Sequence, residues 1–129
     1  MRLTIAFVLV TFVLFLGARS AAAHHSIAGE FDQSKPITFS GKVTKIEWTN
    51  PHARIYVDVA QPNGTVVNWN VELAAVSALS RNGWTRSALK IGDTVTVDGI
   101  HARSGAPIAN ARSVVLPDGR KVLSGTADQ

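Results

Sequence analysis

Apolar residues dominate the start of the chain and then give way to a mixed sequence. Residues 3–16 are apolar except for two threonines, Arg2 precedes them, and residues 17–23 are small apart from one arginine. This order is typical of a secretory signal peptide, and a run of about 14 residues is shorter than the roughly 20 that a membrane-spanning helix needs. We therefore predict a signal peptide over residues 1–23, cleaved after Ala23. Cleavage one residue earlier and an uncleaved membrane anchor are the alternatives.

A polar segment over residues 24–36 follows, in which Ile27 and Phe31 are the only large apolar residues. We expect this segment to form an N-terminal arm. Apolar and polar residues alternate from Ile37 onward, which is the period of a β-strand with one buried face. The phase of the alternation changes after Lys45, so the first strand needs a bulge or strong coiling at that point.

The rest of the pattern predicts further strands with short helical segments among them. Asn63-Gly64 separates the second strand from the third, and this dipeptide is a strong hairpin signal. The expected strands cover residues 52–60, 67–73, 94–101, 108–116 and 121–123, a helix covers 74–81, one more turn covers 84–89, and a frayed tail covers 124–129.

The order strand, strand, strand, helix, strand, strand predicts an all-β domain over residues 37–123. We expect a five-stranded, OB-like, partly open Greek-key barrel with its helix between strands three and four, and a β-sandwich-like meander is the alternative. In the OB-like arrangement the loops 49–51 and 102–107 flank the binding face. His52 and His101 border these loops, so we expect both near the same barrel mouth.

Composition and charge exclude several classes of protein and of functional site. The 129 residues allow one small domain, and the absence of cysteine excludes disulfides, thiolate metal sites and a cysteine nucleophile. Residues 1–23 contain two of the thirteen basic residues and none of the nine acidic ones, so cleavage lowers the formal net charge from +4 to +2. A charge of +2 no longer argues for nucleic acid as a partner.

An adjacent pair, His24-His25, lies at the predicted cleavage site. If His24 becomes the N-terminus, its α-amine and imidazole can chelate a metal ion together. If Ala23 comes first, the amine, two amides and the imidazole of His25 can form a square-planar Cu(II) or Ni(II) site. Both arrangements suit Cu(II), and a chance pair of histidines at a terminus is the alternative.

His52 follows Asn50-Pro51 and enters the second strand from a restricted loop. A histidine held there can be a metal ligand or a ligand-contacting donor, or it can be one hydrogen-bonded residue of an ordinary turn. Glu72 can support a ligating imidazole by accepting its proton, or it can be a surface acid.

Three further residues, Asn50, Tyr56 and Trp69, are candidates for ligand contact, whereas Trp84 is expected in the core beneath the helix. The sequence contains no G-x-S-x-G, no H-E-x-x-H and no glycine-rich phosphate loop. An enzymatic activity is therefore not favoured.

Several motifs, taken together, resemble those of a known family. In chain order they are Ala23-His24-His25-Ser26, Trp48-Thr49-Asn50-Pro51-His52, Trp69-Asn70-Val71-Glu72-Leu73, Gly83-Trp84-Thr85, Ala109-Asn110-Ala111-Arg112 and Pro117-Asp118-Gly119-Arg120. The chain resembles a family of small exported bacterial proteins classed as a domain of unknown function. The resemblance implies export and a small OB-like barrel, and it carries no activity.

The family pattern matches five of the candidate site residues: His24, His25, His52, Trp69 and Glu72. His101 falls outside this pattern. Arg54 lies where the resemblance implies an aromatic residue, so the ligand affinity or selectivity of this chain can differ from that of its relatives.

These observations predict a bacterial protein of the periplasm or the secreted fraction that binds a small ligand. Cu(II) is the expected cofactor, with His24, His25 and His52 as its ligands, and another periplasmic protein is the second class of partner. Nucleic acid and stable membrane insertion after cleavage are not expected. The alternative function is a module that binds a protein or polysaccharide on the barrel face through Tyr56, Trp69 and the asparagine residues.

Overall fold

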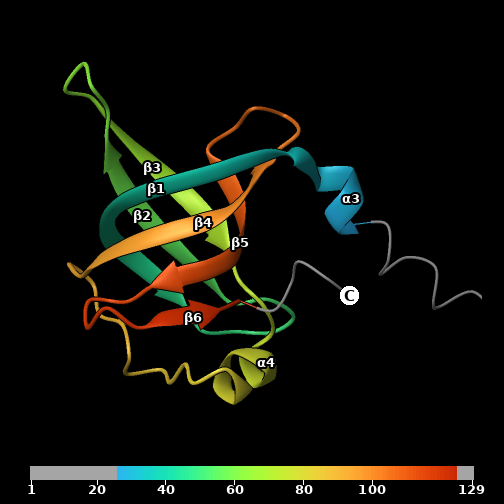
Figure 1. Ribbon diagram of the computed structural model, residues 1–129, viewed down its shortest axis with the longest axis vertical. Helices are drawn as coiled ribbons and strands as arrows, with labels where there is room; N and C mark the ends of the chain where they lie inside the picture. The colour runs from blue at the N-terminus through green and yellow to red at the C-terminus, as the bar shows by residue number, and fades with distance from the viewer. Residues whose placement is uncertain (1–25, 125–129) are drawn as a thin grey trace, which may run out of the picture.

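The computed structural model describes residues 26–124 (Figure 1). The predicted signal peptide, its cleavage site at Ala23, the pair His24-His25 and residues 125–129 lie outside the described residues. Within residues 26–124, no helix is long and apolar enough to cross a membrane.

Six strands in one sheet and two short helices make up the described chain. In chain order they are α3 (Ser26–Glu30), β1 (Phe31–Glu47), β2 (Arg54–Ala60), β3 (Val66–Glu72), α4 (Val76–Arg81), β4 (Thr94–Ala102), β5 (Ile108–Val115) and β6 (Lys121–Leu123).

The sheet closes into a ring in the order β1, β2, β3, β5, β4. The strand β1 is long enough to pair with β4 through its first part and with β2 through its last part, and it curves across the front of Figure 1. Neighbouring strands are antiparallel except β3 and β5, which pair in parallel, and β6 extends the sheet beyond β5. The all-β class and the helix between β3 and β4 are confirmed, and the finer OB-like assignment stays a prediction.

The expected irregularity in the first strand is confirmed. Val43 pairs with Val57, but Lys45 pairs with Tyr56, so Thr44 is an extra residue in β1. The extra residue shifts the inward face by one position, which is why the apolar phase changes there.

The first strand begins at Phe31 rather than at the predicted Ile37. The strand therefore includes Lys35-Pro36, and its register with β4 shifts between Asp32 and Pro36. Proline has no N–H to donate, so it is accommodated next to an irregularity in the ladder. Strands β2 to β6 and helix α4 begin and end within two residues of the predicted bounds. The extra helical turn expected over 84–89 is replaced by non-helical turns.

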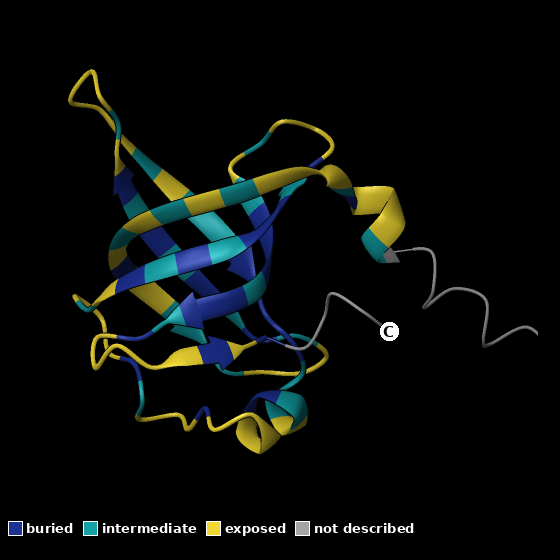
Figure 2. Ribbon diagram, in the orientation of Figure 1, coloured by how far each residue is buried: buried dark blue, intermediate teal, exposed yellow. Residues whose placement is uncertain are grey.

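The core fills the interior of the ring. Alternate residues of β2 and β4 are buried, as Figure 2 shows in dark blue, and their side chains pack on Leu79 of α4 and on Trp84. Trp84 is 1% exposed and stacks against Trp48 with ring centroids 6.3 Å apart, which confirms its core role.

A second, smaller cluster lies where α3 meets the sheet. Phe31 packs with Ile100 and Ala102 of β4, and Ile27 of α3 joins them. Arg103 donates through its backbone N–H to the Glu30 carbonyl (2.8 Å) and through Nε to the Ala28 carbonyl (2.9 Å). The N-terminal part of the described chain is thus held against the barrel.

Candidate functional site

The carboxylate of Glu72 is the centre of a buried polar network. Glu72 is the last residue of β3, and its side chain is only 5% exposed. Its register partners are Arg54 on β2 and Asn110 on β5, so polar side chains cover it from both neighbouring strands. The surface-acid interpretation of Glu72 is therefore wrong, because the pairing of β3 with β5 encloses this position.

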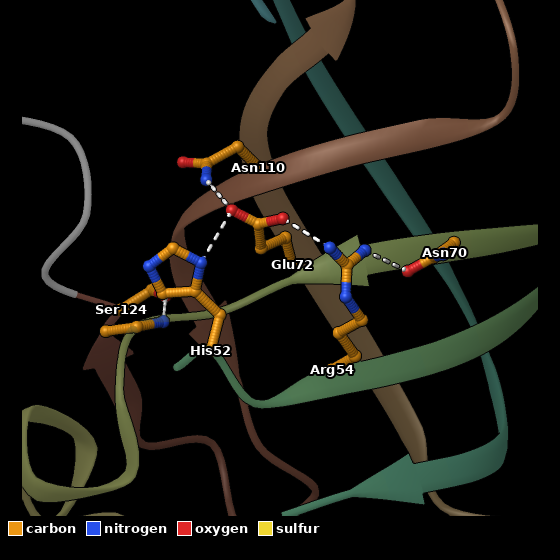
Figure 3. Close-up of polar contacts among 7 residues, drawn as sticks. His52, Arg54, Asn70, Glu72, Asn110 and Ser124 are labelled. Carbon is orange, nitrogen blue, oxygen red and sulfur yellow. Dashed lines mark hydrogen bonds and ion pairs between the residues drawn. The ribbon is translucent and has the colours of Figure 1, made fainter. Parts of the chain in front are cut away.

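Both oxygens of Glu72 have partners (Figure 3). Oε1 lies 3.2 Å from Nδ1 of His52 and accepts a 3.4 Å hydrogen bond from Nδ2 of Asn110. Oε2 accepts a 2.6 Å charge-assisted hydrogen bond from Nη2 of Arg54. A buried carboxylate is costly unless it is paired and hydrogen-bonded, and these three contacts meet that requirement.

The contact with Glu72 determines the orientation of the His52 ring. Nδ1 is the ring nitrogen that faces the carboxylate acceptor, and when the neutral ring carries its proton on Nδ1, Nε2 carries the lone pair. The His52 side chain is 33% exposed. The ring is thus fixed through one nitrogen and can use the other to bind a ligand.

Backbone contacts on either side of His52 hold it in place. The next residue, Ala53, donates to the Ala74 carbonyl and accepts from the Leu73 N–H, at 3.1 and 2.8 Å. The peptide bond between Asn50 and Pro51 is cis. The side-chain oxygen of Asn50 accepts from the N–H of Val76 at the start of α4, so this candidate ligand contact has a structural partner.

The other predicted aromatic contacts lie on different faces of the sheet. Trp69 pairs with the buried Val57, packs against the core, and stacks on Phe39 with centroids 4.7 Å apart. Tyr56 is one position along from Val57, and neighbouring residues in a strand point to opposite faces. The structure therefore does not bring Tyr56 and Trp69 together as one binding surface.

Tyr56 belongs to a partly exposed charged group with Lys45 and Glu47. Its hydroxyl donates to Oε2 of Glu47 at 3.4 Å, and Nζ of Lys45 lies 5.0 Å from its ring centroid. The hydrogen bond between Lys45 and Glu47 raises the pKa of the ammonium and lowers the pKa of the carboxyl.

His101 does not join the network around Glu72. Its Nε2 donates to the Ala106 carbonyl at 2.8 Å, and its ring lies 5.1 Å from the Trp69 ring, on the core side of the sheet. His52 contacts Glu72, which follows the buried Val71 and points to the opposite side. The shared mouth that was expected for the two histidines is not formed.

Sequence reasoning noted Arg54 as a departure from the family pattern but missed its contacts. It also missed the roles of Asn70, Asn110 and Ser124 in this region. Arg54 binds Glu72 and also donates through Nη1 to Oδ1 of Asn70 at 3.0 Å. Asn110 is a polar residue between two alanines of a buried strand, which is the one signal that could have identified it. Ser124 was assigned to the frayed tail, but it is fully buried and its Oγ accepts from the Ala74 N–H at 3.0 Å.

No group of three or more histidine, aspartate and glutamate side chains that could hold a metal ion occurs among residues 26–124. His52 is thus one prospective ligand with a supporting carboxylate. Further ligands would have to come from elsewhere in the chain.

Comparison with protein families gives one match. A model described as a family of unknown function, DUF6152, matches residues 13–110, a span that includes His52, Glu72 and Asn110. No curated protein matches the chain.

Proposed function

The chain belongs to DUF6152, a family of unknown function, and we propose that it is an exported, periplasmic or secreted protein that binds Cu(II). The observation that carries this proposal is the 3.2 Å contact between Nδ1 of His52 and Oε1 of the buried Glu72 carboxylate. Histidines that bind metals in proteins almost always donate their second N–H to a carboxylate, carbonyl or water, which orients the ring and makes the free nitrogen more basic.

The identity of the metal follows from the donors that the sequence offers. A site without cysteine must use imidazole, amine and carboxylate groups, and imidazole and amine nitrogens suit Cu(II). We propose that Nε2 of His52 is the ligand supplied by the folded domain. His24 and His25 supply the remaining nitrogens after cleavage near Ala23.

The packing of α3 supports this combination of ligands. The described chain begins at Ser26, directly after His25 in sequence, and Ile27 is already part of the cluster that contains Ile100. Ile100 pairs with Asn110, and Asn110 pairs with Glu72. Neighbouring strands are about 4.8 Å apart, so the strand residue that anchors α3 is about 10 Å from Glu72.

The test is a calorimetric titration of the exported protein with Cu(II), after mass spectrometry has identified its N-terminus. We expect His52→Ala to weaken binding by at least about tenfold, and Glu72→Gln to weaken it by about tenfold, because loss of a supporting carboxylate typically costs that much. His101→Ala is the matched control and should bind Cu(II) like the wild type.

Unchanged affinity in His52→Ala would reduce the site to a terminal chelate and overturn the role of the folded domain. Affinity no better than that of a free peptide with a terminal histidine would overturn the copper proposal as a whole.

A further inference from the structure

One end of the barrel carries all of the net charge of the described residues. This end, which we call the basic end, consists of residues 76–93, with α4 and the segment that joins it to β4, and of residues 116–123, with β6. It holds five of the eleven basic residues and two of the eight acidic residues of the chain from 26 to 124, so its formal net charge is +3. The other described residues include six of each kind and are neutral overall.

Contacts between the two segments bring the basic end together. Nδ2 of Asn82, at the end of α4, donates to the Leu123 carbonyl of β6 at 3.0 Å. Near the start of β4, Thr96 pairs with Val115, and Val115 pairs in turn with Lys121 of β6. Figure 1 shows α4, the segment between α4 and β4, and β6 at the lower end of the barrel, and Figure 2 shows that these parts are largely exposed.

Most cations of the basic end are available to an external anion. Four of them are exposed and form no ion pair with another described residue, namely Arg81, Arg86, Lys90 and Lys121. The fifth, Arg120, pairs with Asp118 at 2.7 Å. The charge of this end is therefore not neutralised within the described chain.

Two exposed apolar side chains accompany these cations. Ile91 is 70% exposed and Leu123 is 60% exposed, whereas large apolar residues are otherwise mostly buried or half-buried in the described chain. Lys90 directly precedes Ile91. Lys121 is two residues before Leu123 and thus lies on the same face of β6.

Hydrogen bonds hold Ile91 at the tip of a fixed turn. Gly92 donates to the Val43 carbonyl at 2.7 Å, and Val43 donates to the Asp93 carbonyl at 2.8 Å, so the turn is attached to β1. Oδ2 of Asp93 also accepts from the Lys90 N–H at 2.8 Å. The exposure of Ile91 is therefore a property of the folded chain, because the turn cannot fold inward without losing these bonds.

We infer that the basic end binds reversibly to a membrane surface that contains anionic phospholipids. Each lysine or arginine near such a surface strengthens binding by about fivefold, and apolar side chains strengthen it further by entering the boundary between headgroups and acyl chains. Single-stranded nucleic acid would also match the charge, but its binding sites use exposed aromatic side chains, and Trp84, the one aromatic residue of the basic end, is buried. The inference uses none of the residues of the His52–Glu72 network and does not depend on copper binding.

The test is co-sedimentation of the protein isolated from cells, with its N-terminus identified by mass spectrometry, with phosphatidylcholine vesicles that contain or lack phosphatidylglycerol. We expect binding at least about tenfold tighter with phosphatidylglycerol, and a smaller difference at high salt, because salt screens exposed charges. Arg86→Gln and Lys90→Gln should each weaken binding by about fivefold. Lys35→Gln is the matched control, since its side chain is 58% exposed and lies outside the basic end, and it should bind like the wild type.

A second pair of variants separates a lipid surface from other anionic partners. Ile91→Ser and Leu123→Ser should each weaken vesicle binding by about fivefold, because each apolar side chain leaves water when the protein binds. Val66→Ser is their control, since Val66 is also 60% exposed but belongs to β3 outside the basic end.

Equal binding to both kinds of vesicle would overturn the inference, as would wild-type binding in folded Arg86→Gln and Lys90→Gln. If only the charge variants lose affinity, and Ile91→Ser and Leu123→Ser bind like the wild type, the basic end is a purely electrostatic surface and the assignment to lipid is wrong. Thermal unfolding followed by circular dichroism verifies that each variant is folded.

Discussion

At the scale of single residues, the start of β1 after Phe31 shows how local hydrogen bonds determine the charge state of a partly exposed acid. Oδ1 of Asp32 accepts from the hydroxyl of Ser34 at 2.7 Å and from its N–H at 3.0 Å. These bonds favour the ionised carboxylate and hold the pKa of Asp32 below its ordinary value of 3.8.

Substitution of Ser34 by alanine is expected to raise the pKa of Asp32 toward 3.8, because the hydroxyl contact is the largest cause of its lowering. A depressed pKa stabilises the fold above the unfolded-state value, and this contribution is lost as the pH falls through the folded-state pKa. Below pH 4, the unfolding free energy of the variant should thus change slightly less with pH than that of the wild type. A carboxyl titration by NMR measures the shift, and Asp118, whose pKa is lowered by Arg120, is the internal control. An unchanged Asp32 titration contradicts the assignment.

Trp84 shows a different residue-scale effect, since its indole Nε1 is buried and has no hydrogen-bond partner among the described residues. The side chain therefore stabilises the core through its shape and its apolar area. We expect Trp84→Ala to cost about 3–5 kcal/mol of unfolding free energy, and Trp84→Phe to cost clearly less because no hydrogen bond is lost. Denaturant unfolding measures both. Equal losses in the two variants would show that the indole nitrogen does have a partner.

Glu72 marks the limit of sequence reasoning at this scale. Alternation along β3 correctly placed it on the face opposite Val71, and that face is usually solvated. Its burial depends on Arg54 and on Asn110, which is 38 residues away in sequence. No local sequence pattern indicates such a contact. The sequence therefore suggested that Glu72 could support a ligating imidazole, but it did not predict the contacts with Arg54 and Asn110.

At the scale of elements, β1 must bend sharply because it pairs with β4 on one side and β2 on the other. Gly41 lies where the pairing changes partners, and a Cβ atom there would lie 2.2 Å from the Asp58 carbonyl oxygen and 2.8 Å from Cγ1 of Val57. The two strands can approach this closely only because Gly41 has no side chain.

Alanine at Gly41 is therefore expected to destabilise the protein by at least about 1–3 kcal/mol, since the neighbouring backbone must move. Gly29 in α3 is the control, because nothing lies within 4 Å of a Cβ atom there. Alanine at Gly29 should be neutral or stabilise the fold by up to about 1 kcal/mol. Urea unfolding of both variants measures the difference, and a tolerated Gly41→Ala would mean that β1 can shift away from β2.

The element α3 was not predicted, although Ile27 within it and Phe31 directly after it were identified as apolar. A helix of five residues is not stable alone and has too few turns to show a helical period in the sequence. Ile27 and Phe31 were therefore interpreted as isolated apolar residues in a polar arm. The helix is stabilised by Ile100 and Ala102 and by Arg103, all of which come from the far part of the chain.

At the scale of the whole molecule, the strand order and the hairpin between β2 and β3 followed from local alternation and turn signals. The barrel was predicted only from the order of the elements, because ring closure depends on contacts such as that between Thr38 and Asp98, which are 60 residues apart. Local sequence thus predicted the strands, and long-range packing produced the site.

The parallel pairing of β3 with β5 has a consequence for the order of folding. It joins three residue pairs, of which the last is Glu72 with Asn110, and it can form only after both neighbouring hairpins have come together. Contacts between distant segments pay the entropy of loop closure and form late. We therefore expect the polar network around Glu72 to be completed late in ring closure. An ion bound there would stabilise the closed ring by its binding free energy and would slow the separation of β3 from β5.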